Sequence, residues 1–132
     1  MLTEIQLSIK GLDWKFKLYS NKEYIRLNGK SSQGFTMKAE REAHFNLNYI
    51  ETPLILHELV HVYMSSCCID SAEIDSYERE EIFADLIGHH ISDIQRDAKS
   101  IIDHFVTEAK KDHKNYVKLR IYKEIEDEQT DI

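Results

Sequence analysis

The segment from Pro53 to Ser65 most constrains how this chain can fold, because its pattern is that of a helix with apolar residues almost all the way round. Thr52 is a good N-cap, and proline fits the first helical position. The apolar residues are Leu54, Ile55, Leu56, Leu59, Val60, Val62, Tyr63 and Met64. A helix without a polar face is expected inside a protein. The two histidines and one glutamate that it carries are costly to bury unless something satisfies them.

These three polar residues form the pentapeptide His57-Glu58-Leu59-Val60-His61. A separation of four residues puts both imidazoles on one face of a helix, which suits two ligands of one tetrahedral zinc ion. Glu58 lies about 100° round the helix and can point toward a water held by the metal. The pattern therefore predicts a zinc site with Glu58 as catalytic general base. Two helix histidines can also simply hydrogen-bond to neighbours, and Glu58 can form a salt bridge.

A catalytic zinc site needs a third protein ligand and one open position. Glu81 begins a second helical pattern twenty residues past the pentapeptide, and Asp85 follows four residues later on the same face. Helical phase places Glu81 beside the edge of the apolar stripe, Glu80 inside the stripe and Glu78 further away. We expect Glu81 to bind the metal, with Glu80 as the runner-up. Asp85 can accept the free N–H of a ligand histidine, such as His57, and so orient it.

The combined pattern resembles the gluzincin metallopeptidases, in which a His-Glu-x-x-His helix is followed by a helix carrying Glu-x-x-x-Asp. The stretch Glu81-x-x-Ala84-Asp85-x-Ile87-Gly88 is similar to the Glu-x-x-Ala-Asn/Asp-x-Phe-Ala stretch of the ImmA/IrrE-type peptidases of phages and mobile elements. The resemblance covers Phe45 to about His90. It implies a zinc-dependent enzyme that hydrolyses a peptide bond in a peptide or protein substrate. A cytoplasmic location is the default expectation for a sequence that shows neither a membrane span nor the layout of a signal peptide.

The expected fold is α+β, a minimal gluzincin-like (zincin) fold. A small, mostly antiparallel sheet would pack on the His-Glu-x-x-His helix and on a second helix that carries the third ligand. Strands are predicted at Leu2–Ile9 and Leu12–Leu18, joined as a hairpin by Lys10-Gly11, and at Tyr24–Leu27 and His44–Asn48.

The predicted second helix is capped by Asp75 or Ser76 and runs to about Ile94 or as far as Lys111. Its expected apolar face comprises Ile82, Phe83, Leu86, Ile87, Ile91 and Ile94. No motif identifies the group that stabilises the oxyanion of a reacting peptide. The candidates are His89, Tyr77 and Tyr63, for each of which a packing or surface role is the alternative.

Length and charge limit the remaining possibilities. The 132 residues predict one domain, 1–132, and the net charge of −7 without a basic stripe argues against nucleic-acid binding. No apolar run is long enough to span a membrane, and the N-terminus lacks the layout of a signal peptide. The adjacent Cys67 and Cys68 are expected as free thiols in a reducing compartment. Residues 116–132 are ambiguous, because Val117, Leu119 and Ile121 alternate as in a strand, whereas Glu124–Ile132 has the composition of an acidic, partly disordered tail. The pattern does not predict an oligomeric state.

Two alternative functions stay open at this point. Within the phage-type resemblance, the chain can be a zinc-stabilised regulatory module that binds a protein without cleaving it. It can also be a metal-free protein with a coincidental motif. For the peptidase, we expect Phe45–Asn48 to be the edge strand that pairs with an extended substrate.

Overall fold

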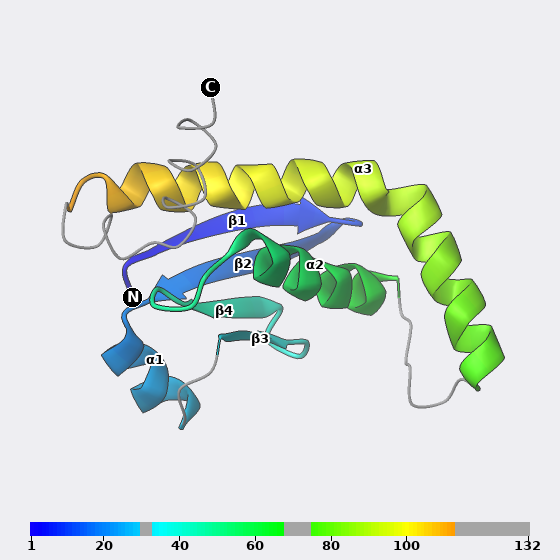
Figure 1. Cartoon of the computed structure of the whole chain (residues 1–132), viewed down its shortest axis with the longest axis horizontal. Helices are drawn as coiled ribbons and strands as arrows, with labels where there is room; N and C mark the ends of the chain where they lie inside the picture. The colour runs from blue at the N-terminus through cyan, green and yellow to red at the C-terminus, as the bar shows by residue number, and fades with distance from the viewer. Residues whose placement is uncertain (30–32, 68–74, 113–132) are drawn as a thin grey trace, which may run out of the picture.

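The computed structural model describes residues 1–29, 33–67 and 75–112 of the chain, which form an α+β fold (Figure 1). Four strands make one mixed sheet in the order β1-β2-β4-β3. Two of its three strand pairings are antiparallel, and the central pairing of β2 with β4 is parallel. The expected strand near residues 117–121 and the acidic tail lie outside the described residues.

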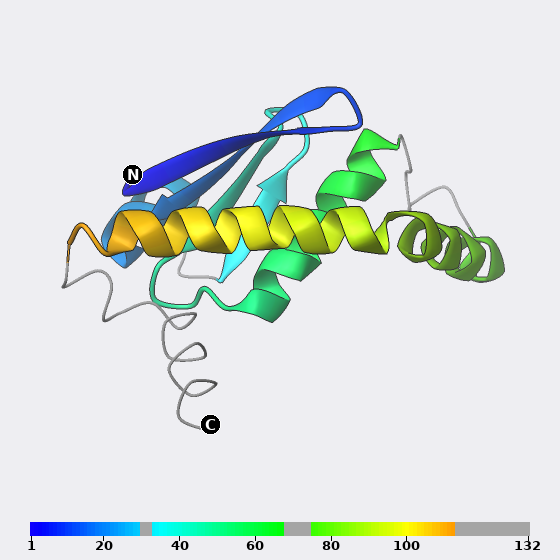
Figure 2. The same cartoon turned by 90° about the horizontal axis from the view of Figure 1, so that it is seen from above.

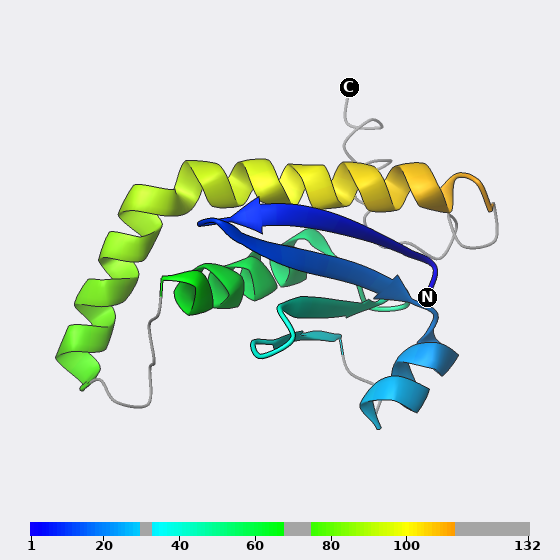
Figure 3. The same ribbon diagram turned by 180° about the vertical axis from the view of Figure 1, so that it is seen from behind.

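The first two strands form the predicted hairpin, β1 (Thr3–Ile9) and β2 (Leu12–Tyr19), which is seen from behind in Figure 3. Lys10 and Gly11 both have positive φ, 53° and 78°, as the two central residues of a type I′ hairpin turn require. Inward-facing residues of β2, such as Trp14 and Phe16, are fully buried, whereas Asp13 and Lys15 are exposed. The period-two pattern of the sequence therefore sets the two faces of the sheet.

Residues 24–27 are helical, so the strand predicted at Tyr24–Leu27 is wrong. They belong to helix α1 (Asn21–Asn28), which is capped by the Ser20 side chain and ended by Gly29 in the left-handed conformation, φ 77°. Tyr24 is fully buried and meets the ring of Phe35 edge-on at 6.4 Å. The cap, the terminator and this contact outweigh the weak strand tendency of four residues.

The other two strands are β3 (Gly34–Met37) and β4 (Glu42–Asn46), which form a second antiparallel hairpin. The predicted strand His44–Asn48 corresponds to β4, shifted by two residues. β3 was not predicted. It is one of the two edge strands of the described sheet, with β1 at the other edge, whereas β4 lies between β2 and β3. Phe45 and Asn46 belong to this inner strand, so the expectation that Phe45–Asn48 is an edge strand is wrong.

Helix α2 (Thr52–Ser66) carries the pentapeptide and packs on the sheet together with α3 (Ser76–Ala109). Glu51 occupies the N-cap position of α2, so the helix begins one residue earlier than predicted. The side chain of Asp75 caps α3 by accepting a hydrogen bond from the Glu78 amide, as expected, and α3 continues almost to Lys111. Both helices share one apolar core with the inner face of the sheet.

Helix α3 changes direction along its length (Figure 1). Its C-terminal segment lies along the sheet and buries Ile94, Ile101 and Phe105, while the N-terminal segment points away from the rest of the fold (Figure 2). The predicted apolar face is correct at the buried Leu86 and Ile94. It is wrong at Ile87 and Ile91, which are 38% and 39% exposed. Among the described residues, no helix is long and apolar enough to cross a membrane.

Candidate metal centre

Helix α2 is open to solvent along one stripe, which contains both histidines of the pentapeptide. The side chain of His57 is 65% exposed, and His61 one turn later is half-buried. The opposite side is buried by core residues such as Ile55, Leu59 and Val62. The expectation of a helix buried all the way round is thus corrected by this stripe, which leaves the two imidazoles accessible to a ligand.

The two imidazoles already converge on one point. Their Nε2 atoms are 3.2 Å apart, and the rings lie 4.8 Å apart between centroids with an angle of 76° between their planes. Two nitrogens that bind one zinc ion at about 2.0–2.1 Å, separated by a tetrahedral angle, lie roughly 3.3–3.4 Å apart. The observed separation of His57 and His61 therefore fits two ligands of a zinc ion. It equally fits a hydrogen bond between two neutral imidazoles.

Glu58 lies beside this pair but inside the protein. Its side chain is 5% exposed, and its Oε1 atom is 4.0 Å from Nε2 of His57. Its other oxygen, Oε2, accepts a hydrogen bond of 2.5 Å from the hydroxyl of Thr36 on β3. One oxygen of the Glu58 carboxylate is therefore bound by Thr36, and the other lies on the side of the two histidines.

A cleft opens where the edge strand approaches the first turns of α2. Its volume is about 430 Å³. The lining residues are Gln33, Gly34, Glu51, Pro53, Leu54, His57 and Glu58. The cleft thus joins the start of the edge strand to one histidine and the glutamate of the pentapeptide, and a ligand bound in it would lie against both.

Glu81 and Asp85, the predicted third ligand and its partner, are both exposed on the N-terminal segment of α3. In the parts of the chain that the structure describes, no three His, Cys, Asp or Glu side chains are grouped closely enough to hold a metal ion. The structure brings His57 and His61 together as a pair, with Glu58 Oε1 lying 4.0 Å from Nε2 of His57, and does not group Glu81 with them. Glu78 and Glu80 are exposed as well, so burial does not distinguish the three glutamates.

The candidate oxyanion stabilisers occupy three different environments. Tyr63 is buried, and its hydroxyl donates a 2.5 Å hydrogen bond to the carboxylate of Asp97 on α3. Burial, and then this hydrogen bond, raise the pKa of Tyr63 far above its ordinary value. Tyr77 is 73% exposed. His89 lines a separate hollow of about 300 Å³ between the end of α2 and α3, together with Asp85. None of the three lines the cleft described above.

Two residues that take part in these hydrogen bonds, Thr36 and Asp97, were not predicted from the sequence. Thr36 lies on a strand that was not predicted, although Phe35 and Met37 alternate with it as in a short strand. Asp97 is 5% exposed, and Arg96 contacts its second oxygen at 3.4 Å. The sequence pattern could have indicated Asp97, because this residue lies on the same helical face as Ile94 and Ile101, where a charged side chain requires a partner.

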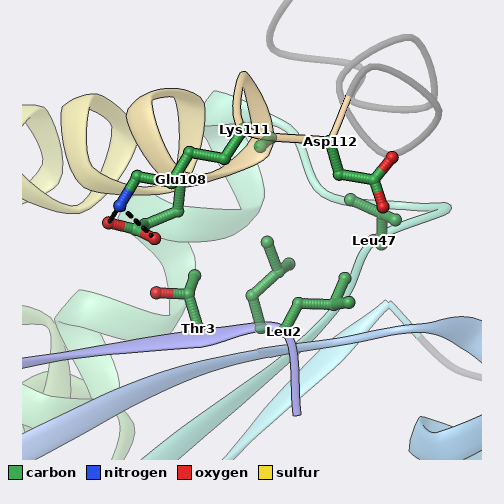
Figure 4. A pocket seen from close by; sticks show the side chains of 8 residues that line it. Leu2, Thr3, Leu47, Glu108, Lys111 and Asp112 are labelled. Atoms are coloured by element: carbon green, nitrogen blue, oxygen red, sulfur yellow. Dashed lines mark hydrogen bonds and ion pairs between the residues drawn. The ribbon is translucent and has the colours of Figure 1, made fainter.

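A further pocket of about 200 Å³ lies beside the N-terminus, where β1 approaches the end of α3 (Figure 4). Leu2, Leu18 and Leu47 contribute apolar surface to it. The Lys111 ammonium and the Glu108 carboxylate pair with each other at 2.9 Å on its rim. Its lining carries the charged residues Glu108, Lys111 and Asp112, and it includes no histidine or cysteine.

Comparison with known proteins identifies no relative: no family model, no curated protein and no solved structure matches this chain.

Proposed function

We propose that this chain is a zinc-dependent peptidase with a minimal gluzincin-like fold. The observation that carries the proposal is the convergence of His57 and His61 at 3.2 Å between their Nε2 atoms, beside the buried carboxylate of Glu58. His57, His61 and Glu81 would together hold one zinc ion, and Asp85 would orient a ligand histidine. A zinc ion bound there supplies a water acidified to near neutrality and a Lewis acid for the carbonyl oxygen.

The residues of this chain divide the remaining work. Glu58 takes the proton of the attacking water and passes it to the leaving amine. Its 4.0 Å distance from His57 Nε2 suits proton transfer beside the metal ligands better than ligation. The core around Leu59 and Val62 keeps the helix, and with it the spacing of these groups, fixed.

The substrate is proposed to bind as an extended peptide along β3. An edge strand offers unpaired backbone groups, which can hydrogen-bond to a peptide and fix the depth of its scissile bond. The cleft begins at Gln33 and Gly34 and reaches His57 and Glu58. We expect a peptide that pairs with the start of this strand to reach His57 and Glu58 through the cleft.

The test is a metal and activity assay on four proteins. The parent should bind one zinc per chain and cleave fluorescein-labelled casein, and Glu58→Gln should keep the zinc and lose cleavage. His57→Ala should lose zinc, whereas His89→Ala, which removes an exposed histidine of α3, should keep it. A parent that takes up no zinc on titration contradicts the proposal. Loss of zinc in Glu58→Gln would mean that this residue has another role.

A second candidate is a zinc-stabilised, phage-type regulatory module that binds a protein without cleaving it. None of the three candidate oxyanion stabilisers, His89, Tyr77 and Tyr63, lines the cleft beside His57 and Glu58, and this favours the second candidate. It predicts zinc binding without cleavage, and a Glu58→Gln variant indistinguishable from the parent in partner binding and in zinc affinity. The peptidase predicts cleavage that depends on Glu58, so the same assay separates the two.

A further inference from the structure

The hydroxyl of Thr36 donates a hydrogen bond to the Glu58 side chain. The Oγ1 to Oε2 distance is 2.5 Å, and the acceptor side chain is 5% exposed. A hydrogen bond in a buried position is electrostatically stronger than the same bond in water. The contact joins two elements that are 22 residues apart in sequence, the edge strand β3 and helix α2.

The register of the sheet explains why Thr36 can reach the glutamate. Thr36 pairs with Ala43, which is fully buried in the core that α2 and the sheet share. The next residue, Phe35, pairs with His44 and contacts the rings of His44 and Tyr24. Because side chains alternate along a strand, Thr36 faces α2 while Phe35 faces the other side of the sheet.

We propose that Thr36 is a positioning residue for Glu58, an inference that rests on the proposed peptidase function. With Oε2 held by the hydroxyl, Oε1 is the oxygen left to exchange a proton, and it lies 4.0 Å from Nε2 of His57. A carboxylate without this bond can rotate about its terminal torsion, which is broad in glutamate. Thr36 therefore keeps the proton acceptor aimed at the side of the helix where the ligand histidines converge.

The edge strand gains a second role from this arrangement. The backbone of β3 is proposed to bind the substrate, and one of its side chains orients the base that acts on it. Substrate position and base position would then be set by the same four-residue strand, so that a shift of β3 moves both together. Misplacement of a catalytic group by about 1 Å can cost on the order of a hundredfold in rate.

The test compares Thr36→Val, which keeps the shape and removes the hydroxyl, with Thr36→Ser, which keeps the hydroxyl. Zinc-loaded Thr36→Val should show a kcat for labelled casein lowered about 10–100-fold, as expected for a misplaced base, with KM and zinc affinity unchanged. Thr36→Ser should restore most of the rate. A second readout independent of turnover is calorimetric binding of acetohydroxamate, which ligates zinc and hydrogen-bonds to a neighbouring carboxylate. Its affinity should fall in the valine variant and recover in the serine variant.

The outcomes separate this inference from the proposed function. A parent that binds neither zinc nor acetohydroxamate overturns both. A parent that binds both, with Thr36→Val equal to it in hydroxamate affinity and in any measurable kcat, overturns the role of Thr36 alone. A valine variant that loses only thermal stability and keeps the parent's kcat assigns Thr36 a structural role and also overturns the inference. Should Thr36→Val not fold, Thr36→Ala removes the same hydroxyl with a smaller side chain.

Discussion

The hydrogen bond between Tyr63 and Asp97 should be a main stabilising link between α2 and α3. The tyrosine hydroxyl lies 2.5 Å from a carboxylate oxygen, and the two residues are 2% and 5% exposed. Tyr63→Phe removes the donor, and among the described residues it leaves the buried carboxylate with the 3.4 Å contacts from Arg96. Hydrogen bonds to charged groups contribute about 1.5–3 kcal/mol, so we expect a loss of about 2 kcal/mol. For a chain of this length, that corresponds to a melting temperature lowered by roughly 6–8 °C.

The assay is urea and thermal unfolding followed by the fluorescence of Trp14, the single tryptophan, which is fully buried. Tyr77→Phe is the matched control, because Tyr77 is 73% exposed and its variant should stay within about 0.5 kcal/mol of the parent. A double-mutant cycle with Asp97→Leu should give a coupling energy of at least about 1 kcal/mol. If Tyr63→Phe is no less stable than Tyr77→Phe, the reasoning from this contact is refuted.

Two further predictions concern the ionisation of Tyr63 and the replacement of the glycines Gly34 and Gly88. Because burial raises the pKa of Tyr63, ionisation favours the unfolded state once the pH passes the unfolded pKa of about 10. The free energy of unfolding should therefore fall as pH rises beyond that value, and fall less steeply in Tyr63→Phe; equal slopes in urea titrations from pH 8 to 11 would contradict this. A Cβ at Gly34 would lie 2.8 Å from the backbone oxygen of His44, so Gly34→Ala should cost about 1–3 kcal/mol by overpacking. The helical Gly88 has open space around its Cβ position, so Gly88→Ala should gain about 0.5–1 kcal/mol, and melting temperatures that move in the same direction would disprove the contrast.

The parts of the fold that were predicted correctly are those that short stretches of sequence determine. The hairpin depends on alternation and on a two-residue turn, Lys10-Gly11, that accepts positive φ. The two long helices depend on their period and on local signals such as the Asp75 cap. Strand β3 has four residues and exists through its pairing with β4 and its packing on α2, neither of which local sequence reveals.

The candidate site also has one part that local sequence predicts and another that depends on contacts between distant residues. His57 and His61 could be paired from sequence because a spacing of four residues fixes their proximity on any helix. Thr36 could not be assigned to Glu58, because 22 residues and the position of an unpredicted strand separate them. The apolar face of α3 was misplaced by including Ile87 and Ile91. Periodicity reports which residues are apolar, whereas the bend of α3 decides which of them reach the core.

That bend bears directly on the third zinc ligand. If Glu81 completes the site, its carboxylate must approach the histidine pair, and the N-terminal segment of α3 must then pack more closely on α2 when zinc binds. Glu81→Ala should therefore lower zinc affinity far more than Glu78→Ala or Glu80→Ala, which change equally exposed carboxylates on the same segment. Asp85→Ala should cost roughly 10–100-fold, as is typical of residues that orient a ligand.

Competitive zinc titration of these variants measures the affinities, and amide hydrogen exchange of residues 76–88 measures the movement. Zinc should slow exchange in this segment of the parent and leave it unchanged in Glu81→Ala, because only a ligand on the segment can couple its position to the metal. Unchanged exchange in the parent, together with normal zinc affinity in Glu81→Ala, would show that the site is completed elsewhere. Loss of zinc binding in Glu80→Ala alone would instead identify Glu80 as the third ligand, the residue that helical phase placed inside the apolar stripe.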